Sequence, residues 1–334
     1  GALTGHIISV VIAGLVGSLI LFKLYRGFGR PSSSFSSSIK VMLSYGLPLY
    51  ASSLLGLFLG QYQTIILAFF TSNAEIGNFS IAANLSSLIS VLVFPMGVLF
   101  PAFSKVDPDS AELKSIFKLS VKYTAMLIVP ATVIVAVLSR DIVYTLYGDS
   151  YGLGPLFLQL YILTFLSSGF GSVVIGNLFQ GIGETRVVFR YSLINVLVFL
   201  PLAPVFAVAY HVPGLIVASL TSSLFSLAYA LFIVVKKIKL SLDLKASLRI
   251  YLASSLSAVP VLGLLHVLPL NNALSLAING PVFLLTYLTI LPLTKAIDQT
   301  DLQNFKLMFS KLKVIWPLLK PVLAYEAKLA STFT

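Results

Sequence analysis

The fold is decided by two apolar runs, FRYSLINVLVFLPLAPVFAVA (189–209) and PGLIVASLTSSLFSLAYALFIVV (213–235), followed by KKIK (236–239). Each run has the length of about 20 residues that a helix needs to cross the hydrocarbon of a bilayer. Arg186 and Arg190 stand at the start of the first run, whereas the short turn between the runs carries no Lys or Arg. The pattern therefore predicts two antiparallel membrane helices whose basic ends lie on one side.

The same pattern extends along the whole chain and predicts an all-α integral membrane protein. Hydrophobic residues make up 57% of the sequence and charged residues 10%, and the mean hydropathy is +0.98. Soluble domains are about 25% charged, so a water-soluble fold, including a soluble enzyme, is excluded. Helices are expected because a closed barrel needs alternating, half-polar strands. About nine spans are predicted, at roughly 5–22, 44–70, 78–102, 119–138, 154–179, 189–209, 213–235, 248–268 and 274–294.

The basic residues fix how these spans are threaded. When the spans alternate across a bilayer, 21 of the 22 Lys and Arg residues fall on one side and only Arg140 falls on the other. Cytoplasmic loops retain Lys and Arg. The net charge of +11 therefore indicates how the chain is oriented in the membrane and does not indicate nucleic-acid binding. We expect a multi-pass protein of the cell membrane with its N-terminus outside and its C-terminus in the cytoplasm.

The chain is divided into five predicted parts. An internal similarity between residues 1–26 and 214–239, in which Lys23 matches Lys236, suggests that each segment closes one lobe of a repeated structure. Since residue 1 is Gly and not Met, we expect the other helices of the first lobe to be absent from this sequence. The parts are the last helix of that N-lobe (1–26), a cytoplasmic Ser-rich interlobe linker (27–43), a six-helix C-lobe (44–240), a final helix pair (247–295) and a cytoplasmic amphipathic tail (297–334).

The tail carries a helical stripe of apolar side chains. Asp298 or Thr300 can cap a helix. The stripe consists of Leu302, Phe305, Phe309, Leu312 and Trp316. This spacing favours a helix lying on the inner leaflet, with Lys residues on its other face attracted by anionic lipid. The alternative is a helix packed on the cytoplasmic face of the protein.

No constellation typical of an enzyme, a cofactor site or a metal site is visible. Cys is absent, so a thiolate nucleophile and Cys-ligated metals are excluded. The His residues, His6, His211 and His266, are scattered near the outer ends of predicted spans. Asp141 lies beside Arg140, which favours a paired surface charge over a catalytic acid. Gly181-Ile-Gly183 lacks the Lys-Ser/Thr of a phosphate loop and is interpreted as a turn.

Uncharged polar side chains inside the spans are the candidates for a substrate cavity. The centres of the spans contain no Asp, Glu, Lys or Arg, which argues against a carboxylate-coupled transport site within these helices. A polar side chain facing lipid is costly unless it is paired. Each candidate is therefore either a hydrogen bond between helices or part of the wall of a wet cavity that contacts sugar hydroxyls. The candidates are Gln61, Gln63, Asn84, Gln159, Asn177 and Asn195.

Several motifs resemble the Wzx-type polysaccharide flippases of the multidrug/oligosaccharidyl-lipid/polysaccharide (MOP) superfamily. Tyr45-Gly-Leu-Pro-Leu is similar to the family's GLPL opening of the seventh helix, and residues 76–83 (IGNFSIAA) resemble its VGIYSAA start of the eighth. Residues 98–105 (VLFPAFSK) look like LFPLLSR, and residues 146–151 (LYGDSY) look like LFGEEY. The resemblance covers about residues 40–240 and continues through a GRTK-like turn at 183–186 and a GLLGAA-like opening at 213–215.

The resemblance implies a two-lobe transporter of fourteen helices, of which this chain would hold the sixth through the fourteenth. It implies the flipping of lipid-linked oligosaccharide or polysaccharide precursors by alternating access, without a cofactor or covalent chemistry. The implied partners are the lipid-linked glycan, membrane lipids and a glycosyltransferase or polymerase, but no nucleic acid. Relatives often carry charges where Gln61, Gln63 and Asn84 stand, so contacts to lipid phosphate are expected either from the absent lobe or from the cytoplasmic rim, unless the carrier lipid is weakly charged. The candidates there are Lys40, Lys105, Arg186 and Lys236.

Two other functions stay open on the sequence. A MATE-like drug or cation antiporter of the same superfamily predicts an ionisable residue buried in the bundle. A non-transporting membrane scaffold for glycan assembly predicts instead that the polar side chains are paired helix to helix, with no continuous polar cleft.

Overall fold

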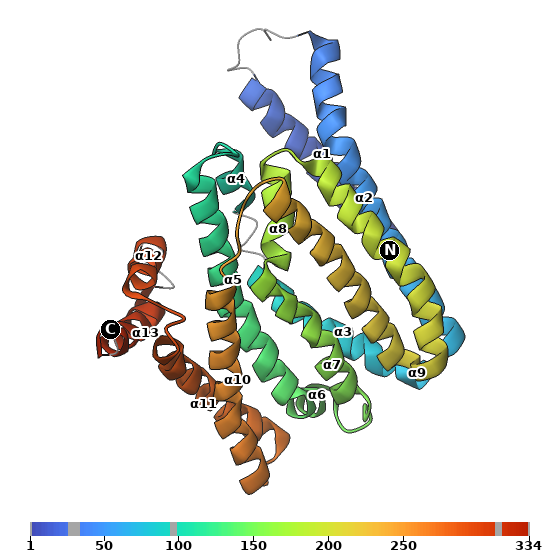
Figure 1. Cartoon of the computed structure of the whole chain (residues 1–334). Coiled ribbons are helices and arrows are strands. Elements are labelled where there is room, and N and C mark those ends of the chain that lie inside the picture. Colours follow the sequence, from blue (N-terminus) through green and yellow to red (C-terminus); the bar gives the residue numbers. More distant parts are fainter. Residues whose placement is uncertain (1, 26–33, 94–98, 311–315, 333–334) are drawn as a thin grey trace. The chain divides into compact units, whose positions relative to one another are not determined.

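The structure is a computed structural model that describes residues 2–25, 34–93, 99–310 and 316–332. All regular secondary structure in these ranges is helical, which confirms the all-α membrane fold expected from the sequence. The chain divides into two compact units, residues 1–46 and 47–334 (Figure 1). The helices are α1 (Ala2–Tyr25), α2 (Phe35–Phe70), α3 (Asn73–Val93), α4 (Leu99–Ser104), α5 (Ala111–Val137), α6 (Ser139–Tyr147), α7 (Gly154–Ile162), the 3₁₀ helix η2 (Leu163–Phe170), α8 (Ser172–Gly181), α9 (Thr185–Lys236), α10 (Leu244–Val267), α11 (Asn272–Leu293), α12 (Gln299–Phe309) and α13 (Trp316–Thr332).

Six helices of the described chain are long and apolar enough to cross a membrane, or seven if the bent α7–η2–α8 segment is one span. These helices are α1, α2, α5, α9, α10 and α11. Helix α9 has 52 residues, about 78 Å at 1.5 Å per residue, which is far more than one bilayer requires. Its backbone breaks at His211, where φ is 53°, and its two arms run antiparallel (Figure 1). The predicted turn at 210–212 is thereby confirmed, whereas the total of nine spans stays a prediction.

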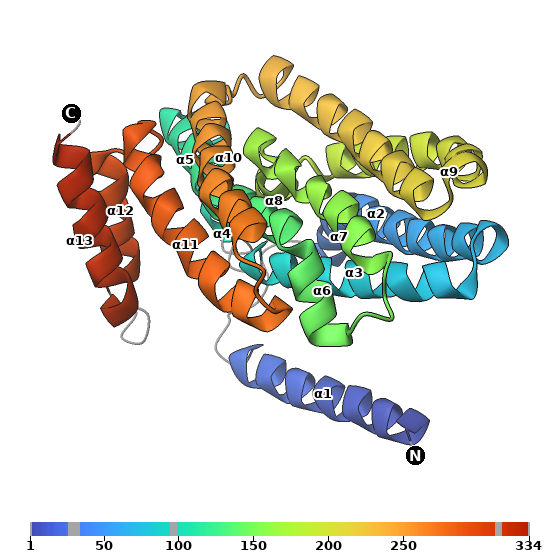
Figure 2. The same cartoon turned by 90° about the horizontal axis from the view of Figure 1, so that it is seen from below.

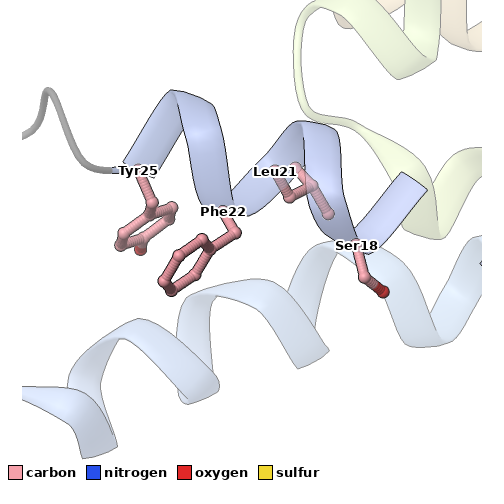
Figure 3. Close-up of a pocket in the computed structure, with 4 residues that line it drawn as sticks. All are labelled: Ser18, Leu21, Phe22 and Tyr25. Atoms are coloured by element: carbon pink, nitrogen blue, oxygen red, sulfur yellow. The ribbon is translucent and has the colours of Figure 1, made fainter. Parts of the chain in front are cut away.

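The Ser-rich segment differs in its second half from the predicted linker. Residues 26–33 lie outside the described residues, but α2 already begins at Phe35. The Ser37 hydroxyl donates to the Ser34 carbonyl (2.7 Å) and the Ser38 amide donates to the same carbonyl (3.1 Å). These two bonds close the first helical turn, so residues 35–43 are helix and not a flexible linker. In the same unit, the described side chains of α1 are almost all exposed, and a shallow groove on it is lined by Ser18, Leu21, Phe22 and Tyr25 (Figure 3).

Helix α5 is the centre of residues 47–334. It packs against η2, α10, α7, α3 and α8, and contacts α11 through side chains that share one apolar cluster (Figure 2). A second cluster joins Phe103 of α4, Phe117 of α5 and Phe179 of α8. A Cβ at Gly181 would lie 2.6 Å from the Cβ of Phe103, so the close approach of α4 to α8 requires glycine there. Gly183, with φ of 82°, then completes the predicted turn into α9.

Tyrosine hydroxyls bond the carbonyls that two prolines leave free inside the helices. Proline has no N–H, so the carbonyl four residues earlier loses its helical partner. Pro130 frees the Met126 carbonyl, which accepts a hydrogen bond from the hydroxyl of Tyr287 on α11 (2.9 Å). Pro204 similarly frees the Leu200 carbonyl, which accepts from Tyr62 on α2 (2.9 Å). At both prolines the freed carbonyl therefore has a donor on a neighbouring helix.

The tail helix α12 is held against α5 by a polar cluster. Asp298 and Asp301 form a capping box at its start. Lys122 of α5 pairs with Asp301, and the Tyr123 hydroxyl donates to the other oxygen of Asp301 (3.1 Å). Leu302 of the apolar stripe is buried and Phe305 contacts the α5 cluster, whereas the side chains of the other stripe residues lie outside those described. This part of the stripe therefore faces protein, which favours the packed alternative over a helix lying on lipid.

Glu326 is a buried carboxyl group on α13, which lies beside α11 and α12 (Figure 2). The residue is 2% exposed, and neither carboxyl oxygen has a hydrogen-bond partner among the described residues. Burial raises the pKa of Glu326 from 4.5 to about 8. Deprotonation would leave an unpaired charge in an apolar site, so the docked helix requires the neutral acid at neutral pH.

The first prediction concerns the proline-freed carbonyl of Leu200. Tyr62→Phe removes the hydroxyl that bonds it, and we expect the free energy of unfolding to fall by about 0.5–2 kcal/mol, the range for such bonds in proteins and membranes. Thermal melting in detergent measures the loss. The matched control is Tyr161→Phe, because the Tyr161 hydroxyl has no hydrogen bond recorded among the described residues. Equal melting temperatures for the two variants would contradict the proposed role of Tyr62.

The second prediction is a pH dependence of α13 docking. The docked state binds the Glu326 proton more tightly than the undocked state, so docking is strongest below about pH 4.5, weakens as the pH rises toward about 8 and levels off above it. The slope is at most about 1.4 kcal/mol per pH unit. Amide hydrogen exchange in α13 reports undocking. Glu326→Gln should remove the pH dependence, and identical titrations of the variant and the parent would refute it.

Candidate functional site

The six predicted cavity residues lie on five helices and differ in exposure. Gln61 of α2, Asn84 of α3 and Gln159 of α7 are exposed. The remaining three are half-buried, namely Gln63 of α2, Asn177 of α8 and Asn195 of α9. Because their helices are spread over the bundle, the structure does not gather all six into one cavity.

Two of these residues, Gln159 and Asn177, donate hydrogen bonds to backbone carbonyls. The Gln159 amide donates to the Ala136 carbonyl of α5 (3.1 Å), so Gln159 joins two helices. The Asn177 amide donates to the Val173 carbonyl one turn earlier on its own helix (3.4 Å). For Gln159 the structure favours the interhelical hydrogen bond over a cavity wall, whereas Asn84 and Gln61 keep exposed amides.

Asn84 is the centre of a polar stripe on the exposed face of α3. Ser80, Asn84 and Ser87 are all exposed and follow each other at the four- and three-residue spacing of one helix face. The opposite face, with Ala82, Leu85 and Ser86, is buried in the bundle. The Ser80 hydroxyl donates to the Ile76 carbonyl (2.8 Å) and the Ser87 hydroxyl to the Asn84 carbonyl (2.6 Å). The amide of Asn84 is thus the group of this stripe best placed to bind a hydroxyl-rich ligand.

The segment α7–η2–α8 is a span that breaks in its middle. The stretch Gly154–Phe170, which contains α7 and η2, meets α8 at an angle of 51° across Gly171, whose φ of 84° is left-handed and favours glycine. A 3₁₀ stretch within a helix lacks ordinary helical bonds and commonly marks a hinge. Helix α10 satisfies two of its carbonyls: the Tyr251 hydroxyl donates to Leu166, and the Ser247 hydroxyl donates to Gly169 (2.7 Å).

The broken span and its partners on α10 were not predicted. The stretch from Ser167 to Ser172, SSGFGS, lies inside an apolar run, and its paired glycines are a signal that such a helix bends. A Cβ at Gly169 would collide with the ring of Tyr251, so α10 can approach η2 only over glycine. The hydroxyl of Ser168 is buried without a partner among the described residues, which is a further polar group within the break.

The predicted phosphate contacts are exposed. Lys105 follows α4, and Arg186 and Lys236 lie in the first and last turns of α9. Because α9 reverses at His211, its two ends reach the same side, and Glu184 pairs with Lys237 across them (2.6 Å). Arg186 and Lys236 therefore belong to one rim. Lys40 is also exposed and belongs to the other unit, residues 1–46.

His211 and Asp141 both have partners that the sequence did not reveal. His211 lies at the turn of α9, and its Nδ1 is 3.0 Å from the Phe70 carbonyl at the end of α2. The predicted surface pair of Arg140 and Asp141 is wrong. Asp141 is buried and bonded to Ser275, while the guanidinium of Arg140 lies 5.6 Å from the centre of the Tyr144 ring. Successive residues on a helix point in different directions, which separates the two charges.

Comparisons with known proteins agree with the sequence motifs. A family model described as polysaccharide biosynthesis protein matches residues 2–153. The lipopolysaccharide biosynthesis protein WzxC of Escherichia coli (strain K12) is 24% identical over 200 residues, which cover 58% of this chain and 40% of the relative. An uncharacterized membrane protein in the cps region of Klebsiella pneumoniae is 24% identical over 207 residues, 60% of this chain and 41% of that protein. The chain thus spans less than half the length of these curated relatives.

A solved structure shares the fold. The lipid II flippase MurJ in an inward closed conformation superposes with a TM-score of 0.59 at 17% identity, covering 77% of this chain and 52% of that one. This likeness confirms the fold, while the family model and the sequence relatives confirm the resemblance to Wzx-type flippases.

The third prediction concerns the broken span. Tyr251→Phe keeps the ring, which lies 6.0 Å from that of Phe170, but removes the donor to the Leu166 carbonyl. We expect faster amide hydrogen exchange in residues 163–171 and a loss of about 0.5–2 kcal/mol in the free energy of unfolding. Tyr229→Phe is the matched control, since the Tyr229 hydroxyl has no hydrogen bond to any residue that the structure describes. Unchanged exchange in Tyr251→Phe would show that α10 does not hold the break.

Proposed function

We propose that this chain, which belongs with the Wzx-type flippases of the MOP superfamily, is part of a transporter that moves lipid-linked oligosaccharide or polysaccharide precursors across the cell membrane. The observation that carries the proposal is the exposed stripe Ser80–Asn84–Ser87 on α3. Polar side chains on a lipid-facing surface are unfavourable, so this stripe is expected to border a wet cleft. Gln61, exposed on α2, adds a second amide that can bind sugar hydroxyls.

The proposed mechanism is alternating access. The sugar head passes through a polar cleft that opens to either side in turn, while the isoprenoid tail stays in the bilayer. Amides and hydroxyls along the cleft replace water around the sugar, which lowers the cost of moving it through hydrocarbon. The 51° break in α7–η2–α8 provides a place where a helix can bend between the two openings. Net movement requires either different binding strengths at the two openings or a substrate gradient.

The sidedness of the chain belongs to the same proposal. The basic rim of Arg186 and Lys236 would face the cytoplasm and bind the phosphate of the carrier lipid before the sugar enters the cleft. Helices α12 and α13 would lie on that side too, where a glycosyltransferase or polymerase could deliver the lipid-linked glycan. No covalent step is needed, so we propose transport and not catalysis.

The two rival functions make predictions that the described residues test. A MATE-like antiporter requires an ionisable side chain within the bundle, but the buried carboxyl groups that are described, Asp141, Asp301 and Glu326, lie outside the central portions of the spans. A scaffold requires helix-to-helix pairing of the polar residues, and this holds for Gln159 and not for the exposed Asn84. Both observations favour the flippase.

The fourth prediction is a selective loss of transport. Asn84→Leu removes the amide of the α3 stripe, and we expect flipping to slow by about 10-fold, the equivalent of one hydrogen bond of about 1.4 kcal/mol, with an unchanged melting temperature. The assay follows exposure of a labelled lipid-linked glycan in vesicles that contain the purified protein. Gln303→Leu is the matched control, because Gln303 is an exposed amide on α12, away from the stripe.

The same assay separates the functions. Wild-type protein that binds the glycan but does not speed its exposure would support the scaffold. Asn84→Leu that flips at the wild-type rate would place the stripe outside the pathway, whereas joint loss of stability and transport would make Asn84 a packing residue.

A further inference from the structure

Asp141 is a buried carboxyl group without a cation to balance it. It lies in the first turn of α6 and is 8% exposed. Its Oδ2 accepts a hydrogen bond from the Ser275 hydroxyl of α11 (2.5 Å), and no ion pair to Asp141 is found in the described part of the chain. A single hydroxyl compensates a buried carboxylate poorly, because removing such a charge from water costs several kcal/mol.

Asn279 extends this cluster by one more helical turn. Its Nδ2 donates to the Ser275 hydroxyl oxygen (3.0 Å), and the residue is 1% exposed. The side-chain oxygen, Oδ1, has no hydrogen-bond partner among the described residues. A buried carbonyl oxygen of this kind usually has a donor or a bound ion.

The orientation of the Asn279 amide follows from the hydrogens available. Ser275 has one hydroxyl hydrogen, and it is given to Asp141. The hydroxyl oxygen can therefore only accept from Asn279, which makes the bonded amide atom the nitrogen and leaves the oxygen unpaired. Turning the amide would place its oxygen against the Ser275 oxygen, an arrangement that is unfavourable alone but favourable when a cation contacts both oxygens. The cluster therefore has an unpaired oxygen and an unbalanced negative charge, and a bound cation would satisfy both.

We propose that Asp141, Ser275 and Asn279 bind a small monovalent cation, with Na⁺ as the expected ion, where α6 meets α11. The three residues supply a carboxylate, a hydroxyl and an amide oxygen, which are the hard oxygen ligands that alkali and alkaline-earth cations prefer. One carboxylate balances one positive charge, which favours a monovalent over a divalent ion. The absence of His and Cys from this cluster argues against a transition metal.

The proposed ion would join parts of the chain that are distant in sequence. Asp141 precedes α7 and the broken span, whereas Ser275 and Asn279 begin the last long helix, α11. A cation bound by both would lock α6 to α11 and oppose their separation during any movement of the bundle. The site does not depend on the proposed transport, because binding can be measured without a glycan.

The fifth prediction tests this site in the purified protein. Replacing choline chloride by NaCl at equal ionic strength should raise the melting temperature by a few degrees in a saturable manner. Asp141→Asn should abolish the response to Na⁺, and so should Asn279→Leu, which replaces the unpaired amide by an apolar group of similar size. Asp149→Asn is the matched control, since Asp149 is an exposed acid in the turn after α6 and should leave the response unchanged.

A second readout separates binding from packing. Wild-type protein should bind radioactive ²²Na⁺, and Asn279→Leu should not, even if its melting temperature in choline equals that of the wild type. Equal melting temperatures of the wild type in choline and Na⁺, or an undiminished response in both variants, would overturn the proposal.

Discussion

The structure depends on one constraint: a backbone carbonyl inside the hydrocarbon must accept a hydrogen bond, and no water is there to donate it. Prolines and the 3₁₀ break free such carbonyls, and hydroxyl groups from neighbouring helices bond them. The hydroxyl of Tyr62 donates to the carbonyl freed by Pro204, and that of Tyr287 donates to the carbonyl freed by Pro130. The hydroxyls of Tyr251 and Ser247 donate to carbonyls of η2. These bonds decide which helices are neighbours and at which height they meet.

The same constraint explains where polar side chains are tolerated. Some polar side chains pair within the protein. The Gln159 amide donates a hydrogen bond to the Ala136 carbonyl, and Lys122 forms an ion pair with Asp301. A polar group that stays exposed within a predicted span must have another environment, and this applies to the amides of Asn84 and Gln61. The distinction between pairing and exposure carries the functional proposal, since the side chains are chemically alike and only their surroundings differ.

Local patterns predicted much of the fold. Apolar length predicted long membrane helices such as α5, α10 and α11, and the short turn without Lys or Arg predicted the reversal of α9 at His211. The sequence could not reveal partners that are far apart along the chain, such as Asp141 with Ser275 or Tyr251 with Leu166. The amphipathic pattern of α12 has the same period whether its apolar face contacts lipid or α5, so only the structure distinguishes the two. Among the predicted site residues, the pattern could not separate Gln159, whose amide bonds α5, from Asn84, whose role stays a prediction.

The bonds at η2 also limit how the bundle can move. Helix α10 belongs to the final helix pair, which lies outside the predicted six-helix lobe, yet Tyr251 and Ser247 hold the carbonyls at the break. Bending at η2 must either carry α10 with it or release two carbonyls into an apolar environment, which is costly. Helix α11 is tied to α5 by Tyr287 and to α6 by Ser275. The final pair is therefore bonded to η2 and to α5 and α6, which precede the broken span, so bending at the break is expected to involve α10 and α11.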